Sequence, residues 1–184
     1  MRMKALAATG IAMLASACST SGDATHTVAG PASSDHPRAV LVGADGRPRG
    51  TVSVVQVHGG VSLSVQAENM PPGVHGAHVH AVGRCDRPDF ASAGPHWNPT
   101  NRLHGRENPA GAHMGDIPNI TIGADGRGTL QYEIQGAWIR RGATPMLDAD
   151  GAAFVIHANA DDHRTDPSGN SGGRVACAVL RYPG

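Results

Sequence analysis

The chain has 184 residues, of which 25 are glycine and 13 proline, but it has only two phenylalanines, two tryptophans and two tyrosines. This composition favours an aliphatic core built from many short strands that are separated by turns. The formal net charge is zero, and apart from Arg2 and Lys4 the chain has 13 arginines against 15 acidic residues and no lysine. A balance of this kind excludes a basic nucleic-acid-binding surface.

Residues 1–17 predict a signal peptide. A basic start, MRMK, precedes the apolar run ALAATGIAMLASA, which is too short to span a bilayer. The small residues Ala15, Ser16 and Ala17 come directly before Cys18, and this stretch resembles the cleavage box of bacterial lipoproteins. The resemblance implies that Cys18 becomes the lipidated first residue of the mature protein. The alternative is an ordinary signal peptide followed by an unmodified cysteine.

Residues 18–36 are small, polar and without periodicity, which predicts a flexible tether. With a lipid on Cys18, this tether would connect a membrane to a domain at residues 37–184. We therefore expect an extracytoplasmic protein that is lipid-anchored to the bacterial cell membrane or envelope. The sequence leaves open whether the protein stays anchored or is shed.

The domain at residues 37–184 has a pattern of short strands and turns. Eight segments are rich in β-branched residues or alternate between apolar and polar residues; they cover 38–43, 50–57, 61–68, 76–82, 118–122, 128–134, 152–157 and 174–180. The triplet Ala-Asp-Gly, which is typical of tight turns, occurs at 44–46, 124–126 and 149–151. The pattern predicts an all-β fold, an eight-stranded antiparallel sandwich or barrel.

Two long segments, 83–117 and 158–173, have no strand pattern. Long irregular segments inside a compact domain usually carry function. We therefore expect the functional site in these two loops and on the strands beside them.

Three of the eleven histidines lie within six residues, in the stretch GVHGAHVH. His78 and His80 are two residues apart in a predicted strand, so both imidazoles leave the same face while Val79 points into the core. This pair predicts two metal ligands. His75 is three residues from His78 and faces elsewhere, which favours a structural role in hydrogen bonds to loop backbone.

The first long loop adds His96, His104, His113 and Asp116, and the strand at 152–157 ends in His157. Imidazole nitrogens together with a carboxylate are a donor set typical of zinc. Imidazole also suits copper, whose redox chemistry needs an open coordination position. The sequence therefore predicts a metal centre built from three parts of the chain.

The chain has three cysteines, and assigning Cys18 to the lipid leaves Cys85 and Cys177. In an oxidising compartment this pair predicts one disulfide, with two free thiols as the alternative. Such a bond would close a long loop and tie the first irregular segment to the last strand.

Six motifs in register give the chain a resemblance to the copper–zinc superoxide dismutase family, and it covers nearly all of residues 37–184. The motifs are GVHGAHVH (73–80), SAGPHWNP (92–99), LHG (103–105), HMGD (113–116), VIHANADD (155–162) and GNSGGRVACAV (169–179). Each motif alone is weak, but in this order and with these spacings they are specific. The resemblance implies Greek-key connections between the strands.

By this resemblance each chain holds one copper ion and one zinc ion. The implied copper ligands are His78, His80, His96 and His157, and the implied zinc ligands are His96, His104, His113 and Asp116. His96 belongs to both sites, as a deprotonated imidazolate that bridges the two metals. Asp161 corresponds to the family's carboxylate that hydrogen-bonds one copper ligand and one zinc ligand.

The resemblance also implies a reaction, the dismutation of superoxide to oxygen and hydrogen peroxide by a redox-cycling copper beside a structural zinc. Arg174 corresponds to the arginine at the mouth of the family's copper site, where a guanidinium attracts the superoxide anion. The Cys85–Cys177 disulfide matches the family pattern as well. Anchored outside the cytoplasm, such an enzyme would protect the cell envelope from external superoxide.

One segment departs from the family. The loop between Asp162 and Arg174 is short beside that of many members, and it has no lysine. In the family this loop shapes the electric field that steers superoxide inwards. The strength of steering is therefore open, with Arg164 as one candidate contributor. His58 and His163 match no ligand position of the family, and we expect both to be exposed turn residues.

Other functions fit parts of the pattern. A non-catalytic extracytoplasmic copper-binding or carrier protein would have the same fold, but here all seven ligands and Arg174 are present. An enzyme that uses copper alone would lack some of the zinc ligands. The oligomeric state is open, with a homodimer as one option.

Overall fold

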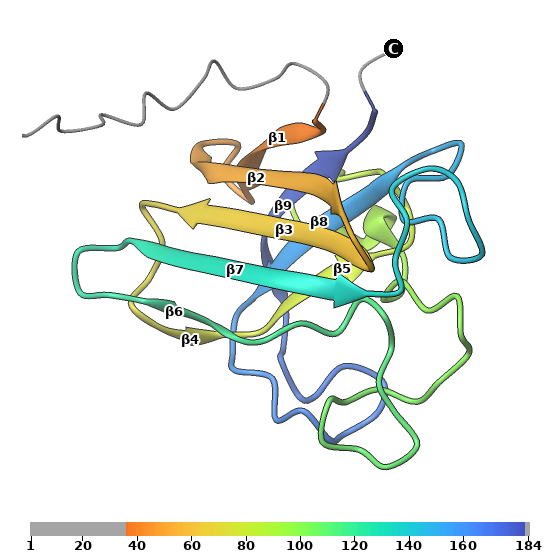
Figure 1. Ribbon diagram of the computed structural model, residues 1–184. Coiled ribbons are helices and arrows are strands. Elements are labelled where there is room, and N and C mark those ends of the chain that lie inside the picture. The colour runs from red at the N-terminus through yellow and green to blue at the C-terminus, as the bar shows by residue number, and fades with distance from the viewer. Residues whose placement is uncertain (1–35, 183–184) are drawn as a thin grey trace, which may run out of the picture. The chain divides into compact units, whose positions relative to one another are not determined.

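The computed structural model describes residues 36–182, and in that range it contains nine β-strands and one short 3₁₀ helix (Figure 1). The strands are β1 (Arg38–Gly43), β2 (Pro48–Val57), β3 (Gly60–Ala67), β4 (Gly73–His75), β5 (Ala77–His80), β6 (Ile120–Ile122), β7 (Gly128–Gln135), β8 (Ala152–His157) and β9 (Arg174–Leu180), and the 3₁₀ helix η1 covers Ala91–Ala93. The predicted signal peptide, Cys18 and all of the predicted tether except His36 lie outside the described residues. No helix in the described range is long and apolar enough to cross a membrane.

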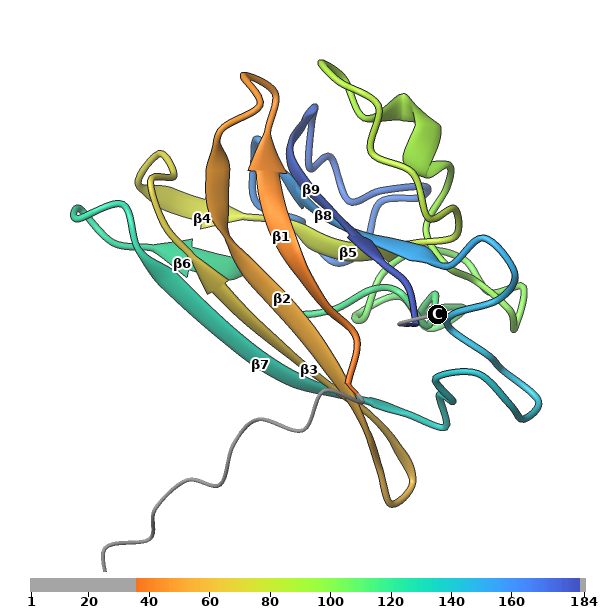
Figure 2. The ribbon, with the colours of Figure 1, turned by 90° about the horizontal axis from the view of Figure 1, so that it is seen from above.

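Seven strands form one antiparallel sheet in the order β5-β8-β9-β1-β2-β3-β7, and β4 pairs with β6 in a separate ribbon. Figures 1 and 2 show that the large sheet curls, so that β5, β8 and β9 lie behind β1, β2, β3 and β7. The neighbours β1 and β9, β3 and β7, and β5 and β8 are far apart in the sequence, as Greek-key connections require. The predicted all-β antiparallel fold with two long loops is confirmed.

The predicted strand at 76–82 is β5, which ends at His80, and directly before it lies β4, a ninth strand that was not predicted. Gly76 separates β4, which pairs with β6, from β5, which pairs with β8. A Cβ atom at Gly76 would lie 2.9 Å from Cβ of Ser171 and 3.4 Å from Cβ of Asp161. The second long loop passes so close to this backbone that only glycine leaves room for it, and the chain changes sheets at this residue.

The main hydrophobic core lies inside the curled sheet. Alternate residues of β2 and β3 are buried there, among them Val52, Val54 and Leu63, and Val79 of β5 and Phe154 of β8 pack against them. Strand alternation places apolar residues on the inner face, which is the pattern that the sequence predicted.

A smaller buried cluster lies on the other face of β8 and β9. It contains Phe90, Ala93, Ala153, Val155 and Cys177, with Cys85 packed against it. The predicted disulfide between Cys85 and Cys177 is present. It fixes the beginning of the first long loop, including η1, against the last strand.

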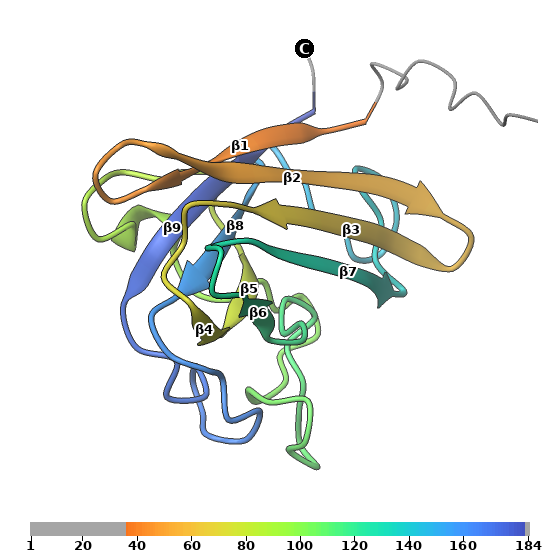
Figure 3. The ribbon, with the colours of Figure 1, turned by 90° about the vertical axis from the view of Figure 1, so that its left-hand side faces the viewer.

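The two long loops lie together at one end of the sheet. Figures 1 and 3 show residues near 105, in green, and residues near 165, in blue, on the same side of β5. The first loop also pairs with the open edge of β5, since N of Val79 donates to O of Gly115 at 2.9 Å and N of Trp97 donates to O of Val79 at 2.8 Å. This pairing brings both loops to the histidines of β5.

Candidate metal centre

Two buried histidines on β5 begin the site. His78 and His80 are 0 % and 1 % exposed, and Val79 between them is part of the core, as strand parity predicts. Backbone bridges join His78 to Asp116 and His80 to His96 along the open edge of β5. Two residues of the first loop are therefore held beside the strand histidines by main-chain pairing.

His157 enters the same place from the neighbouring strand. It is the last residue of β8, directly after a shift in the β8–β9 register, and it pairs across the sheet with Arg174 of β9. Ligand atoms of the four predicted copper residues, His78, His80, His96 and His157, all lie within 4.8 Å of one another. The fold therefore assembles the set that the sequence predicted for copper.

Each of three rings in this set has one bonded nitrogen and one free nitrogen. Nε2 of His78 lies 2.6 Å from Oδ2 of Asp161, Nδ1 of His80 lies 2.8 Å from O of Gly94, and Nδ1 of His157 lies 3.1 Å from O of Gly172. The opposite nitrogens, Nδ1 of His78 and Nε2 of His80 and His157, are buried without a hydrogen-bond partner. Because buried polar atoms without partners cost free energy, this donor set fits a bound metal ion.

Burial keeps these imidazoles neutral. It lowers the pKa of His78 to about 3 and the pKa of His157 to about 4, and it holds the pKa of His80 well below its usual range. The neighbouring ring of His96 lowers all three pKa values further. A neutral ring offers its lone pair to a metal without first losing a proton.

The predicted zinc residues surround a single carboxylate oxygen. Oδ1 of Asp116 lies 2.8 Å from Nδ1 of His96, 3.0 Å from Nδ1 of His104 and 3.2 Å from Nδ1 of His113. The other oxygen, Oδ2, accepts hydrogen bonds from N of Gly105 and N of His113 at 2.9 and 3.0 Å. The backbone thus orients the carboxylate so that Oδ1 faces the three imidazoles, a donor set that fits zinc.

His78 is close to this second set as well. Ligand atoms of His78, His96, His104 and Asp116 lie within 4.8 Å of one another, whereas His113 joins through Nδ1, 3.4 Å from Nδ1 of His96. The two groups therefore adjoin and share His96, as the sequence predicted for the bridging residue. The assignment of each residue to one particular metal stays a prediction.

Electrostatics favour a cation in the second group. Burial raises the pKa of Asp116, but hydrogen bonds with His104, His113 and His96 outweigh it and hold that pKa far below its usual range. Burial lowers the pKa of His104, but contacts with Asp116 and Asp161 raise it to about 9. The carboxylates are thus ionised, and a divalent ion would replace the proton of His104.

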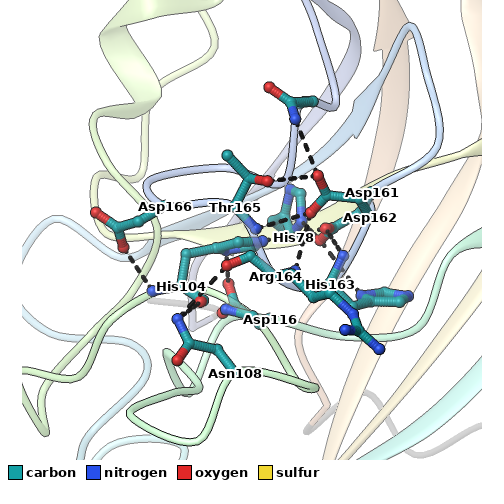
Figure 4. A network of polar contacts seen from close by, with 12 residues as sticks. His78, His104, Asn108, Asp116, Asp161, Asp162, His163, Arg164, Thr165 and Asp166 are labelled. Atoms are coloured by element: carbon teal, nitrogen blue, oxygen red, sulfur yellow. Dashed lines mark hydrogen bonds and ion pairs between the residues drawn. The ribbon is translucent and has the colours of Figure 1, made fainter.

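Asp161 connects the two groups, as Figure 4 shows. Its Oδ2 lies 2.6 Å from Nε2 of His78, and its Oδ1 lies 3.1 Å from Nε2 of His104. A Cβ atom on Gly169, which has a φ of +63°, would lie only 1.7 Å from Oδ1 of Asp161. Asp161 therefore has the contacts that the sequence predicted for it, and Gly169 leaves space for its carboxylate.

Arg174 lies in the wall of an open cavity of about 610 Å³ beside the first histidine group. His80, His96 and His157 line the same cavity. Nη1 of Arg174 donates to O of Phe90 at 2.6 Å and Nη2 donates to O of Gly94 at 2.7 Å, so the side chain is held in one direction. The cavity gives a small anion access to the histidines past a fixed positive charge.

A second arginine of the cavity was not predicted. Arg102 lines it together with Arg174, whereas Arg164, the sequence's candidate for steering, does not. Arg164 is bonded to Oε2 of Glu107 through Nε at 2.9 Å and Nη2 at 2.6 Å. The paired carboxylate cancels most of its long-range field, and no sequence signal distinguished the two arginines.

The other histidines differ in their surroundings. His75 bonds O of His157 at 2.8 Å and O of Pro71 at 3.1 Å, so its predicted structural role is confirmed. His58 is exposed in a turn, as expected. His163 was expected to be exposed too, and this was wrong: its side chain is 17 % exposed and its Nδ1 lies 3.5 Å from Oδ2 of Asp161.

These features define a class of protein, a metalloprotein with adjoining histidine-rich sites for copper and zinc on an antiparallel β-fold. The sequence profile of the family described as copper/zinc superoxide dismutase (SODC) matches residues 48–180. The chain therefore belongs to the copper/zinc superoxide dismutase family, which uses both metals to dismutate superoxide.

Known bacterial proteins are similar over most of the chain. The Cu-Zn superoxide dismutase of Caulobacter vibrioides is 42 % identical over 149 residues, which are 78 % of this chain and 84 % of that protein. The superoxide dismutase-like protein YojM of Bacillus subtilis is 41 % identical over 143 residues, 76 % of this chain and 73 % of that protein.

Solved structures show the same fold. The crystal structure of a SOD-like protein from Bacillus subtilis has a TM-score of 0.75 at 39 % identity and covers 78 % of this chain and 97 % of that one. The Cu/Zn superoxide dismutase from Brucella abortus has a TM-score of 0.61 at 26 % identity and covers 80 % of this chain and all of the other.

Proposed function

We propose that this protein dismutates superoxide at a copper ion beside a zinc ion, with the ligands that its sequence indicates. The observation that carries this proposal is the set of three buried ring nitrogens without partners, on His78, His80 and His157, next to a cavity that Arg174 lines. Bound copper would supply one-electron redox chemistry, which oxidises one superoxide to oxygen and reduces a second to hydrogen peroxide.

His96 is proposed to bridge the two metals as an imidazolate. Its Nδ1 lies 2.8 Å from Oδ1 of Asp116, its ring stacks on that of His78 with centroids 3.9 Å apart, and it belongs to both ligand groups. Burial, the largest influence, lowers the pKa of its imidazolium form and so favours the neutral ring, and loss of the remaining ring proton would require the two metal ions. Nδ1 would then face zinc, and Nε2 would be left for copper or for one of the protons that peroxide takes up.

The remaining residues of the site would bind the substrate or orient the metal ligands. Arg174 would attract the superoxide anion and hold it beside His80 and His157, because its guanidinium is fixed by two carbonyl oxygens. Asp161 would keep the metal-facing nitrogens of His78 and His104 in place through their opposite nitrogens.

The proposed location is the bacterial cell envelope, outside the cytoplasm, with a lipid on Cys18 as the anchor. The support is the sequence around Cys18 and the disulfide, which suits an oxidising compartment. Replacing Cys18 by serine should move the protein from the membrane fraction to the soluble fraction. A homodimer stays a prediction, which sedimentation of the purified protein would check.

The first experiment measures dismutation by the purified protein loaded with zinc alone and then with zinc and copper. Activity should appear only with copper, and His96→Ala should lose it. Tight copper binding without turnover would instead favour the copper-carrier function. The observation behind this second function is the similarity to a protein that is named superoxide dismutase-like.

A further inference from the structure

Asn119 is outside both ligand groups, yet its amide is bonded at both ends to the backbone of Asp161. Oδ1 of Asn119 accepts a hydrogen bond from N of Asp161, and Nδ2 of Asn119 donates to O of Asp161, each at 2.9 Å. Asn119 lies directly before β6, whereas Asp161 is in the second long loop. Two bonds from one rigid amide fix both the position and the rotation of the Asp161 residue.

The placement of Asp161 matters because its carboxylate contacts one histidine of each group. It is 3 % exposed, and its two oxygens are bonded to His78 at 2.6 Å and to His104 at 3.1 Å. A histidine whose distal nitrogen is held presents its metal-facing nitrogen in one direction. The position of Asp161 therefore sets the orientation of both rings at once.

Other contacts do not replace this attachment. N of His163 donates to Oδ1 of Asp161 at 2.6 Å, but His163 belongs to the same loop, and the contact of its side chain outside that loop is again Asn119, whose Nδ2 lies 3.3 Å from Nε2 of His163. Among the hydrogen bonds of residues 36–182, those from Asn119 are the only ones to Asp161 that start outside its own loop and outside the two histidines. Asn119 therefore joins the carboxylate to the sheet-forming part of the chain.

We propose that Asn119 is a positioning residue of the metal centre, which clamps Asp161 so that its carboxylate orients His78 and His104 together. Asp116, a member of the second group, lies three residues before Asn119 in the same short segment. One segment would thus supply a metal ligand directly and align two more through Asp161. The inference rests on the proposed function only in naming copper and zinc as the bound metals.

The test is a double-mutant cycle of Asn119→Ala and Asp161→Asn in the protein loaded with copper and zinc. The readouts are the rates at which zinc and copper pass to a chromogenic chelator and the visible absorption band of Cu(II). Asn119→Ala should speed the release of both metals about tenfold and shift the band, as loss of outer hydrogen bonds does. The double variant should release metal about as fast as Asp161→Asn alone, because Asn119 acts through that carboxylate.

Asn170→Gly is the matched control. Nδ2 of Asn170 donates to Oδ2 of Asp162 at 2.9 Å in the same loop, without contact to Asp161, and its φ of 53° suits glycine. This variant should keep the wild-type band and release rates. If Asn119→Ala does not fold, Asn119→Asp preserves the shape and the oxygen that accepts from N of Asp161. It replaces the donor with a negatively charged oxygen that faces O of Asp161, so it should also release both metals faster than the wild type.

Wild-type release rates and an unchanged band in Asn119→Ala would overturn the proposal, as would effects of Asn119→Ala and Asp161→Asn that add fully in the double variant. Dismutation is measured separately. Fast metal release from Asn119→Ala in a protein without turnover would support the positioning role while removing the proposed enzyme activity.

Discussion

Arg174 and His80 are hydrogen-bonded to the same carbonyl oxygen, that of Gly94. Nη2 of Arg174 donates to it at 2.7 Å and Nδ1 of His80 lies 2.8 Å from it. Gly94 follows η1 in the segment that the Cys85–Cys177 disulfide fastens to β9. The cavity arginine and one histidine of the predicted copper set are therefore aligned by one peptide group.

Arg174→Ala should lower the rate of dismutation by about tenfold, because a fixed cationic group raises the encounter rate of an anion with its site. Arg174→Lys keeps the charge but lacks the planar fork whose two nitrogens bond O of Phe90 and O of Gly94, so it should recover part of the rate. The measurement is the second-order rate constant at several ionic strengths. An Arg174→Ala rate equal to that of the wild type would contradict a role in guiding superoxide.

Arg102 and Arg164 form a matched pair for the steering question. Arg102→Ser should lower the rate at low ionic strength, since Arg102 lines the cavity. Arg164→Ser should have a much smaller effect, because its charge is paired with Glu107. The measurement is the slope of the rate against ionic strength in each variant. A larger change of this slope in the Arg164 variant than in the Arg102 variant would show that the steering field comes from the second loop.

The metal-free protein should lose stability in acid. The pKa values of His78 and His157, about 3 and about 4, lie below the value of 6.5 for an unperturbed histidine. Below pH 6.5 the unfolded chain therefore binds protons that the folded chain does not, so the contribution is fully present above pH 6.5 and falls as the pH drops. The unfolding temperature should decrease from pH 7 to pH 4.5, and less so in His157→Gln.

His104 contributes to the pH dependence of stability with the opposite sign to His78 and His157. Its pKa of about 9 lies above 6.5, so it stabilises the metal-free protein below pH 6.5, and this contribution is lost as the pH rises through 9. His104→Gln should therefore flatten the fall in unfolding temperature between pH 7 and pH 9.5. An unchanged pH profile would mean that His104 is not charged in the metal-free fold.

Loss of the disulfide should lower the free energy of unfolding by about 2–4 kcal/mol, because it closes a loop of 92 residues in the unfolded chain. Urea unfolding of a Cys85→Ser, Cys177→Ser double variant tests this, with Cys18→Ser as the thiol control. Equal urea midpoints for the wild type, the double variant and the Cys18→Ser control would contradict a stabilising role of the disulfide.

His113→Gln should weaken the binding of zinc but not that of copper. His113 contacts Asp116 and His96 and is outside the group of four that contains His80 and His157. Zinc affinity should fall by at least tenfold while copper binding stays close to that of the wild type. Metal titration of the purified variant checks this, and an equal loss of both metals would show that the groups do not bind independently.

Local pattern alone determined much of this protein. The predicted strands at 38–43, 152–157 and 174–180 have the bounds of β1, β8 and β9. His78 and His80 share a face because side chains alternate along a strand, whatever the strand packs against. The ligand types, their order and the cysteine pair are likewise properties of the sequence, so the family resemblance was visible before the fold.

Only the tertiary structure decided which residues meet across the loops. Nothing local shows that Arg102 faces the cavity while Arg164 is paired with Glu107, that His163 is half-buried against Asp161, or that Asn119 clamps Asp161. The break at Gly76 also follows from the approach of a loop about 95 residues later in the chain. Irregular segments have no repeating geometry, so their side chains are placed by long-range packing and hydrogen bonds, which periodicity in a sequence does not encode.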